Sequence, residues 1–317
     1  MLIDSILAQT FHNFELLLID DGSTDRSPLI IDEYTQKDNR IRVFHKNNGG
    51  VSSARNYGLD QARGTFVAFA DNDDYMFPNN LQTMVEAAYS IKEGYDLIIC
   101  SFVRCKRNEI SQCDRNRTIT PVVYAKTQSE MPNAVIKMGY TNFVIWNQLF
   151  KRSIIEKFHI RFSDENSEDE LFSTEFFSYV NNFKQIDYKG YVFIINENSL
   201  GSSHKYITSY DWIRKMEYLY EIIIKKYLIK DSNVHTYNWR IANRLSLLCL
   251  KGYLRDSHIS FYERMAIWKT IRNDMWLKNR IDLSKMNWKI RTILNVAKYR
   301  LYFFFDPIFY IYGIMKS

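Results

Sequence analysis

The stretch that decides the fold is VAFADNDDYMFP, residues 67–78, in which an apolar run leads directly into a cluster of aspartates. Val67 to Ala70 have the composition of a β-strand, and Asp71, Asp73 and Asp74 follow at its end. Carboxylates this close repel one another unless a cation offsets their charge. The cluster therefore predicts a binding site at the end of a strand.

Two carboxylates one residue apart, Asp71 and Asp73, can both face one divalent cation. Oxygen ligands suit Mg²⁺ or Mn²⁺, which keep coordination positions open for phosphates. An EF-hand is excluded, because Met76 stands where its glycine belongs and Gln82 where its glutamate belongs. The alternative to a metal site is an aspartate-rich helix N-cap before Pro78.

Around this stretch, apolar runs of strand length alternate with helix-like segments. Strands joined by helices of about ten residues indicate βαβ units, so we expect an α/β fold with a doubly wound, mostly parallel sheet. The predicted strands lie in residues 14–21, 41–46, 65–71 and 96–102, and the predicted helices in residues 2–9, 27–38, 52–62 and 81–91.

Polar clusters follow three of these strands, as IDDGSTD (residues 19–25), NNGG (47–50) and DNDD (71–74). Each taken alone is consistent with an ordinary polar turn. In open α/β sheets, however, ligands bind beyond the carboxyl ends of the strands. Three clusters at one sheet edge therefore favour a ligand site.

The ordered set IDDGSTD, NNGGVSSARNYGL and GTFVAFADNDDY resembles the inverting, nucleotide-sugar-dependent glycosyltransferases of family 2. The resemblance continues through IWNQLFKRSII (145–155) and SEDELF (167–172), and so covers about residues 1–200. It implies a GT-A fold in a catalytic domain of residues 1–204. The helical texture after it predicts a second domain of residues 205–317.

The resemblance also implies roles for residues at matching positions. Five residues match positions that contact the nucleotide: Asp20, Asp21, Asn48, Gly50 and Arg55. The two aspartates are expected to accept hydrogen bonds from the base. In the DxD motif, Asp73 is expected to ligate Mn²⁺ or Mg²⁺ with help from Asp71, and Asp74 to contact the donor sugar.

On the acceptor side, the resemblance identifies Glu168 and Asp169 as the catalytic acidic pair, with Asp169 as the base. Adjacent carboxylates raise each other's pKa, which favours a base near neutral pH, whereas the alternative is simple compensation of a helix dipole. Trp146 matches a position lining the acceptor pocket, or is a core tryptophan. His204 matches a position near the diphosphate, or is a surface residue; Gln148 departs from the lysine usual in relatives.

Relatives begin with an apolar strand that precedes the helix ending in SILAQTF, whereas this sequence begins within that helix. We therefore expect the first strand of the sheet to be missing, or its place to be filled differently. Its loss exposes strand edges and removes part of the donor site.

The net charge of +6 is unevenly spread. Residues 205–317 hold 21 Lys and Arg against 9 Asp and Glu, and residues 1–204 hold 21 against 27. Nucleic acid is not an expected partner, because no recognised nucleic-acid motif is present. The aromatic and basic residues 298–316 favour peripheral attachment to anionic lipid, while the alternative is a helical subdomain that packs on the catalytic domain or forms a dimer.

The four cysteines, Cys100, Cys105, Cys113 and Cys249, form no CxxC pair, so we expect neither a zinc site nor a disulfide framework. We expect a cytoplasmic location, on the inner face of the membrane.

We expect a metal-dependent hexosyltransferase that moves a sugar from a UDP-sugar to a saccharide or lipid-linked saccharide in surface or capsular polysaccharide synthesis. The alternative is a catalytically silent or truncated paralogue that serves as the partner or membrane-binding subunit of a transferase complex.

Overall fold

The computed structural model describes residues 1–112, 123–138, 144–165, 167–195, 209–229, 234–251, 259–303 and 305. The chain forms two compact units. The first consists of Met1–Asp164 with Glu168–Ser199, and the second of Glu165–Ser167 with Leu200–Ser317.

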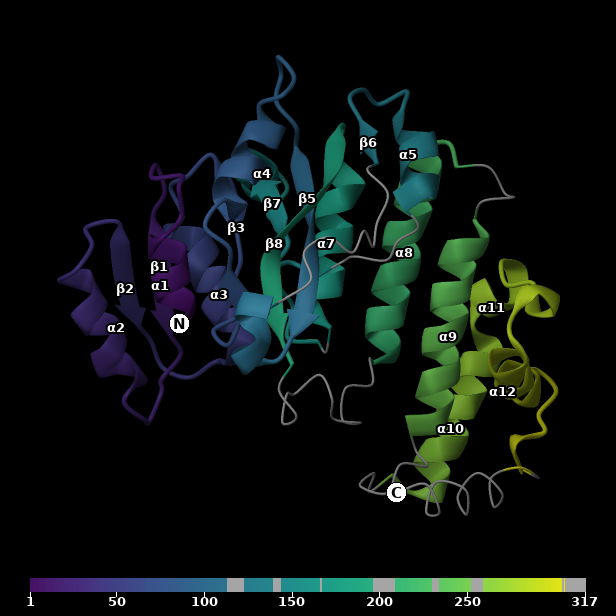
Figure 1. The fold of residues 1–317 in the computed structure, drawn as a ribbon. Helices are drawn as coiled ribbons and strands as arrows, with labels where there is room; N and C mark the ends of the chain where they lie inside the picture. The colour runs from purple at the N-terminus through teal and green to yellow at the C-terminus, as the bar shows by residue number, and fades with distance from the viewer. Residues whose placement is uncertain are drawn as a thin grey trace. The chain divides into compact units, whose positions relative to one another are not determined.

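The first unit opens with a two-stranded parallel sheet. Its strands come from the apolar runs LLLID and IRVFH, and a helix with Pro28 in its first turn connects them. Figure 1 shows these elements in purple and blue. They are α1 (Leu2–Leu7), β1 (Leu16–Asp20), α2 (Ser27–Thr35), β2 (Ile41–His45) and α3 (Gly50–Gln61).

A second sheet follows, with strand order β3-β7-β5-β8-β4 and β6 paired to β8. β5 and β8 are parallel, whereas β7 runs antiparallel to both β3 and β5. The sheet is therefore mixed rather than mostly parallel, because β7 runs opposite to the strand on either side of it. The strands are β3 (Phe66–Ala68), β4 (Tyr75–Met76), β5 (Leu97–Cys105), β6 (Tyr124–Ala125), β7 (Gln148–Lys151) and β8 (Phe183–Ile194).

Within the described residues, β1 pairs only with β2, and β3 pairs only with β7. The side chains of Leu16 to Ile19 are half-buried although all four are apolar. Within the described residues, β1 and β3 therefore belong to two separate sheets.

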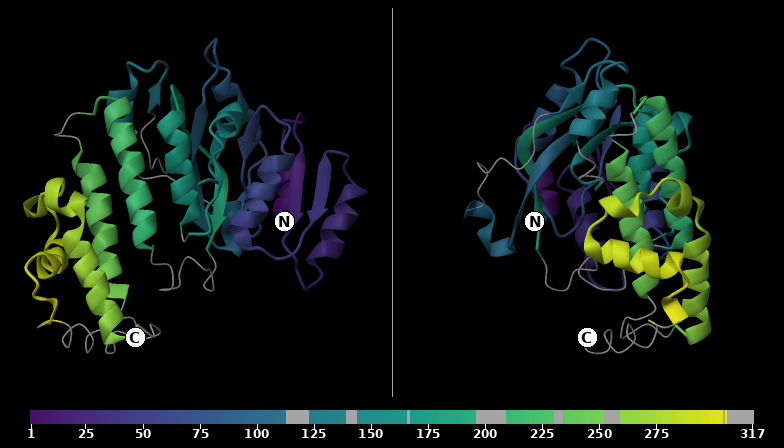
Figure 2. Two further views of the ribbon diagram at one scale, coloured as in Figure 1. Left: turned by 180° about the vertical axis from the view of Figure 1, so that it is seen from behind. Right: turned by 90° about the vertical axis from the view of Figure 1, so that its right-hand side faces the viewer.

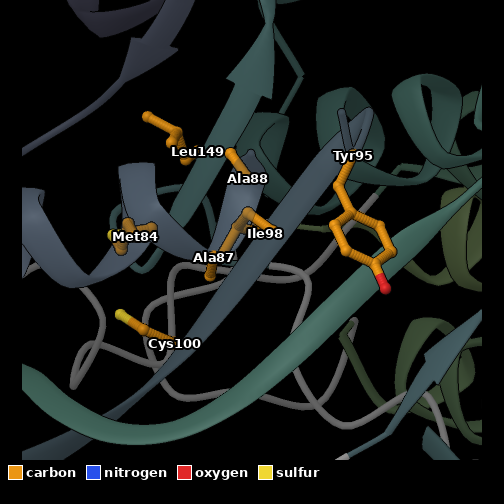
Figure 3. Close-up of a cluster of buried hydrophobic side chains, with 7 residues drawn as sticks. All are labelled: Met84, Ala87, Ala88, Tyr95, Ile98, Cys100 and Leu149. Atoms are coloured by element: carbon orange, nitrogen blue, oxygen red, sulfur yellow. The ribbon is translucent and has the colours of Figure 1, made fainter. Parts of the chain in front are cut away.

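A compact core lies where α4 (Asn80–Ala88) packs on β5. Met84, Ala87 and Ala88 have the i, i+3, i+4 spacing that places side chains on one helix face. Figure 3 shows them with four further buried residues: Tyr95, Ile98, Cys100 and Leu149. Truncation of Ile98 to alanine is expected to cost about 2–5 kcal/mol of unfolding free energy.

An aromatic cluster joins the end of β3 to α7 (Glu168–Tyr179). The Phe69 ring lies 5.2 Å from that of Phe162 and 5.7 Å from that of Phe172, centroid to centroid. Phe162 and Phe172 stack at 4.1 Å. This packing brings the start of α7 to the aspartate loop after β3. The first unit also contains η1 (Arg107–Gln112), α5 (Met131–Met138) and α6 (Arg152–Lys157).

The second unit is helical, as predicted for this part of the chain. Side chains of Ser209, Ser260 and Asn287 accept backbone N–H bonds at the starts of three helices, which explains where those helices begin. In Figure 2, α8 and α9 run side by side, and α10 and α12 pack against α9. The elements are α8 (Tyr210–Lys226), α9 (His235–Lys251), α10 (Phe261–Asn273), α11 (Met275–Asn279), η4 (Leu283–Lys285) and α12 (Trp288–Lys298).

None of the helices in the described part of the chain is both long and apolar enough to cross a bilayer. The stretch 298–316, predicted to contact lipid, lies largely outside the described residues. The cysteine prediction was wrong in one respect. Cys100 and Cys249 are free and buried, but Cys105 is disulfide-bonded.

Candidate active site

The loop between β3 and β4 carries the aspartate cluster, and it is pinned to β8 by Tyr191. The Asp71 backbone N–H donates to the Tyr191 hydroxyl at 3.1 Å, and that hydroxyl donates to Asp74 Oδ2 at 2.7 Å. The Ile194 N–H donates to Asp74 Oδ1 at 2.9 Å. Both Asp74 oxygens therefore have partners from β8.

Asp74 is 1% exposed, and burial raises its pKa to about 6. The hydrogen bonds that its carboxylate accepts from Ile194 and Tyr191 act in the opposite direction. A contact with a donor sugar would require these two bonds to break. Asp74 therefore stabilises the loop through its bonds to β8, and its contact with a donor sugar stays a prediction.

Asp71 and Asp73, in contrast, remain partly accessible. The Asp71 side chain is 36% exposed, and its Oδ1 lies 3.1 Å from Arg55 Nη2. Burial raises the pKa of Asp71, while the Arg55 charge opposes the shift. Among the residues that the structure describes, no three His, Cys, Asp or Glu side chains gather into a metal-binding group.

Arg55 of α3 links the aspartate loop to the acidic pair of α7. Its Nη2 contacts Asp71, and its Nη1 donates to Glu168 Oε1 at 2.6 Å. Its guanidinium carbon also lies 5.4 Å from the centre of the Phe162 ring. Two motifs almost a hundred residues apart thus meet at one guanidinium group.

The acidic pair occupies the first turn of α7, where the helix dipole favours negative charge. Ser167, just before it, has a φ of 63°, a backbone conformation that non-glycine residues adopt with strain. Burial, and next the charge of Glu168, raise the pKa of Asp169 to about 6. Such a carboxylate is ionised at neutral pH and more basic than an ordinary aspartate.

The residues expected on the nucleotide side meet in the loops after β1 and β2. Asp20 is buried, accepts the Ser23 N–H at 3.0 Å, and pairs with His45 Nδ1 at 3.0 Å. The hydrogen bonds with His45 and Ser23 lower the pKa of Asp20 to about 2. Asp20 is therefore ionised and already holds the turn together.

Asp21 connects the two loops. Its carboxylate accepts the N–H of Gly50 at 2.7 Å and of Gly49 at 3.1 Å, and it pairs with Lys46. Burial opposes its ionisation, but these partners outweigh burial and lower its pKa. Asn48 Nδ2 donates to the Asp21 carbonyl at 2.9 Å. In this arrangement, Asp21 caps the start of α3.

Comparison with known proteins identifies the family and the fold. Residues 2–158 match the family model described as Glycosyl transferase family 2. The chain belongs to this family. It is 34% identical over 205 residues to the uncharacterized glycosyltransferase EpsJ of Bacillus subtilis, covering 62% of this chain and 57% of EpsJ. It is 28% identical over 209 residues to the uncharacterized glycosyltransferase YibD of Escherichia coli, covering 64% and 59%.

The family 2 chain thus spans somewhat over half the length of these curated relatives. Among solved structures, residues 1–349 of TarS from S. aureus, crystallised with UDP-GlcNAc, align with a TM-score of 0.66 at 20% identity. The alignment covers 98% of this chain and 84% of that chain. This similarity shows a GT-A-like α/β fold with a helical C-terminal region.

Trp146 lies in the interior of the family 2 domain. Its indole is 6% exposed, stacks on Tyr191 with ring centroids 4.7 Å apart, and meets Phe102 edge-on at 4.6 Å. Almost no indole surface is left for an acceptor sugar, and the side chain supports the residue that pins the aspartate loop. Gln148 is buried on β7 and donates to the Val144 carbonyl at 2.6 Å.

His204 lies outside the described residues. Tyr191, by contrast, is a residue of the site that the sequence did not indicate. It stands in the continuous apolar strand sequence GYVFI, whose pattern predicts burial but not a hydrogen bond to a loop more than a hundred residues earlier. For Lys46, the partner of Asp21, the sequence likewise predicts only a place at the end of a strand.

Proposed function

We propose that this chain is an inverting glycosyltransferase that moves a sugar from a nucleotide diphosphate donor, UDP-linked, to a saccharide or lipid-linked saccharide. The observation that carries the proposal is the contact of Arg55 with both Asp71 and Glu168, which places the DxD loop beside the acidic pair. Family membership and the fold shared with the UDP-GlcNAc complex of TarS support it.

Inverting transfer requires a base that removes the proton from the acceptor hydroxyl as the hydroxyl attacks the sugar. Asp169 suits this task, because its pKa of about 6 leaves it ionised at neutral pH. Glu168 is held by Arg55 and raises the basicity of its neighbour. Both carboxylates remain partly accessible, so an acceptor hydroxyl could reach them.

Asp71 and Asp73 would hold a Mg²⁺ or Mn²⁺ ion. Two partly accessible carboxylates form an incomplete ligand set, which fits ions that take their other ligands from a diphosphate and water. When bound, the ion would offset the charge of the departing nucleoside diphosphate.

A second candidate function is a catalytically silent partner or membrane-binding subunit. The specific observation in its favour is that the carboxylates of Asp20 and Asp21 are already engaged within the loops. In either case we propose a cytoplasmic protein held at the inner membrane face through its basic, aromatic second unit, in surface polysaccharide synthesis. Such a position would bring it to lipid-linked acceptors.

Calorimetric titration with UDP in the presence and absence of Mn²⁺ tests the proposal. We expect Mn²⁺-dependent UDP binding by the native chain and its loss in Asp73→Ala. Asp60→Ala, which changes an exposed aspartate paired with Arg161, serves as the matched control and should bind normally. Absence of Mn²⁺-dependent binding in the native chain would refute the enzyme proposal, and binding without transfer to any acceptor would favour the silent partner.

A further inference from the structure

Arg55 is held from three directions. Its guanidinium contacts Asp71 through Nη2 at 3.1 Å, Glu168 through Nη1 at 2.6 Å, and the face of Phe162. The Arg55 side chain is 16% exposed. A planar group with three fixed neighbours is strongly preorganised, and its geometry cannot be reproduced by an ammonium group.

Glu168 and Asp169 are consecutive residues in the first turn of α7, so their side chains point in directions about 100° apart. Arg55 takes the Glu168 carboxylate, while an Asp169 oxygen accepts the Glu170 N–H at 2.8 Å. Because the two residues are consecutive in one helical turn, the bond between Arg55 and Glu168 holds the backbone from which Asp169 projects.

The same guanidinium contacts the loop that carries the proposed donor and metal ligands. Loss of Arg55 would leave Asp71 and Glu168 facing each other without the cation between them, and their repulsion would move α7 away from the loop. Arg55 thus sets the separation between the donor side and the acceptor side of the site.

We propose that Arg55 is a positioning residue that acts through Glu168 to hold Asp169 against the acceptor hydroxyl, and that it does not serve chiefly as a nucleotide contact. This inference rests on the proposed function. The two roles have opposite kinetic signatures. A positioning residue affects kcat at saturating donor, whereas a nucleotide contact affects the affinity for the donor.

The test measures steady-state transfer from a panel of UDP-sugars and calorimetric UDP–Mn²⁺ binding in Arg55→Gln, Arg55→Lys, Glu168→Gln and the double variant Arg55→Gln/Glu168→Gln. We expect Arg55→Gln to lower kcat about a hundredfold while the UDP Kd changes less than about threefold. Arg55→Lys should not restore kcat, because one ammonium cannot hold two carboxylates in the same plane.

The double variant should lose no more activity than Arg55→Gln, since both changes remove one interaction. Arg161→Gln, which breaks the exposed ion pair between Arg161 and Asp60, is the matched control and should keep native kcat. A tenfold or larger increase in UDP Kd with unchanged kcat, or fully additive losses in the double variant, would overturn the proposal.

If the native chain transfers no sugar, the proposed function fails. The position of Arg55 is then judged by urea unfolding of the native chain, Arg55→Gln, Glu168→Gln and the double variant. We expect Arg55→Gln and Glu168→Gln to be coupled by about tenfold in the unfolding equilibrium constant. Independent effects on unfolding would show that the Arg55–Glu168 pair does not form in solution, and would sink the inference.

Discussion

The pKa of Asp169 leads to a quantitative prediction for the pH dependence of transfer. Burial and the neighbouring Glu168 charge raise this pKa to about 6. A base must be ionised to accept the acceptor proton. The ionised fraction is then about 0.09 at pH 5 and about 0.91 at pH 7, by the ordinary titration equation. We expect kcat to rise about tenfold over this interval.

Initial rates of UDP release, measured at saturating donor and acceptor from about pH 4.5 to pH 8.5, test this prediction. Asp169→Asn should abolish transfer and keep UDP–Mn²⁺ binding, because it removes the base and leaves the donor side intact. Glu168→Gln should move the acid limb of the profile to lower pH, since it removes a charge that raises the pKa of Asp169.

Asp164→Asn is the matched control, because Asp164 is an exposed carboxylate in the same acidic stretch. Its profile should equal that of the native chain. A kcat that stays constant from pH 5 to pH 7 would contradict the assignment of the pKa. Substantial transfer by Asp169→Asn would show that another residue is the base.

Three further changes test other parts of the structure. Tyr191→Phe is expected to cost about 2 kcal/mol of unfolding free energy in urea and to weaken UDP–Mn²⁺ binding, because Asp74 and the Asp71 N–H each lose a hydrogen-bond partner. Native values of the unfolding free energy and of the UDP affinity would contradict the pinning of the loop by Tyr191. Glu217 is 3% exposed, and burial raises its pKa to about 8. The folded state therefore favours the protonated carboxyl group, and the stability of the native chain falls as the pH rises from about 4.5 to about 8. Glu217→Gln, which mimics that form, should gain on the order of 2 kcal/mol over the native chain between pH 5 and pH 7 in urea unfolding, and a pH-independent difference would argue against the shift. Removal of residues 301–317 should reduce co-sedimentation with anionic vesicles, whereas unchanged co-sedimentation would favour packing within the protein.

Local patterns in the sequence were sufficient for the order of the longer helices and strands in residues 2–102 and for the family. The apolar runs at residues 16–19 and 97–100 form strands, and the 84, 87, 88 spacing forms the buried face of α4. Such features depend on residues a few positions apart, so they can be predicted from the chain alone. The DxD loop and the acidic pair were also visible as motifs.

The tertiary structure, in contrast, decided which side chains each residue packs against or forms hydrogen bonds with. Asp73 and Asp74 are neighbours in one motif, yet Asp74 is held in the core by β8 while Asp73 stays partly accessible. The sequence left open whether Trp146 lines an acceptor pocket or lies in the core, and in the tertiary structure it packs on Tyr191. The antiparallel insertion of β7 and the disulfide at Cys105 were not foreseen either.

The physical reason is the range of the interactions concerned. Helix and strand formation depends mainly on local spacing, whereas burial, ion pairing and hydrogen bonding join residues brought together only when the sheet and helices pack. Arg55 is the clearest case, since its partners lie 16 and 113 residues away in sequence. The sequence by itself determined which acidic groups exist and on which elements they stand, and only the tertiary structure decided that one arginine joins them into a site.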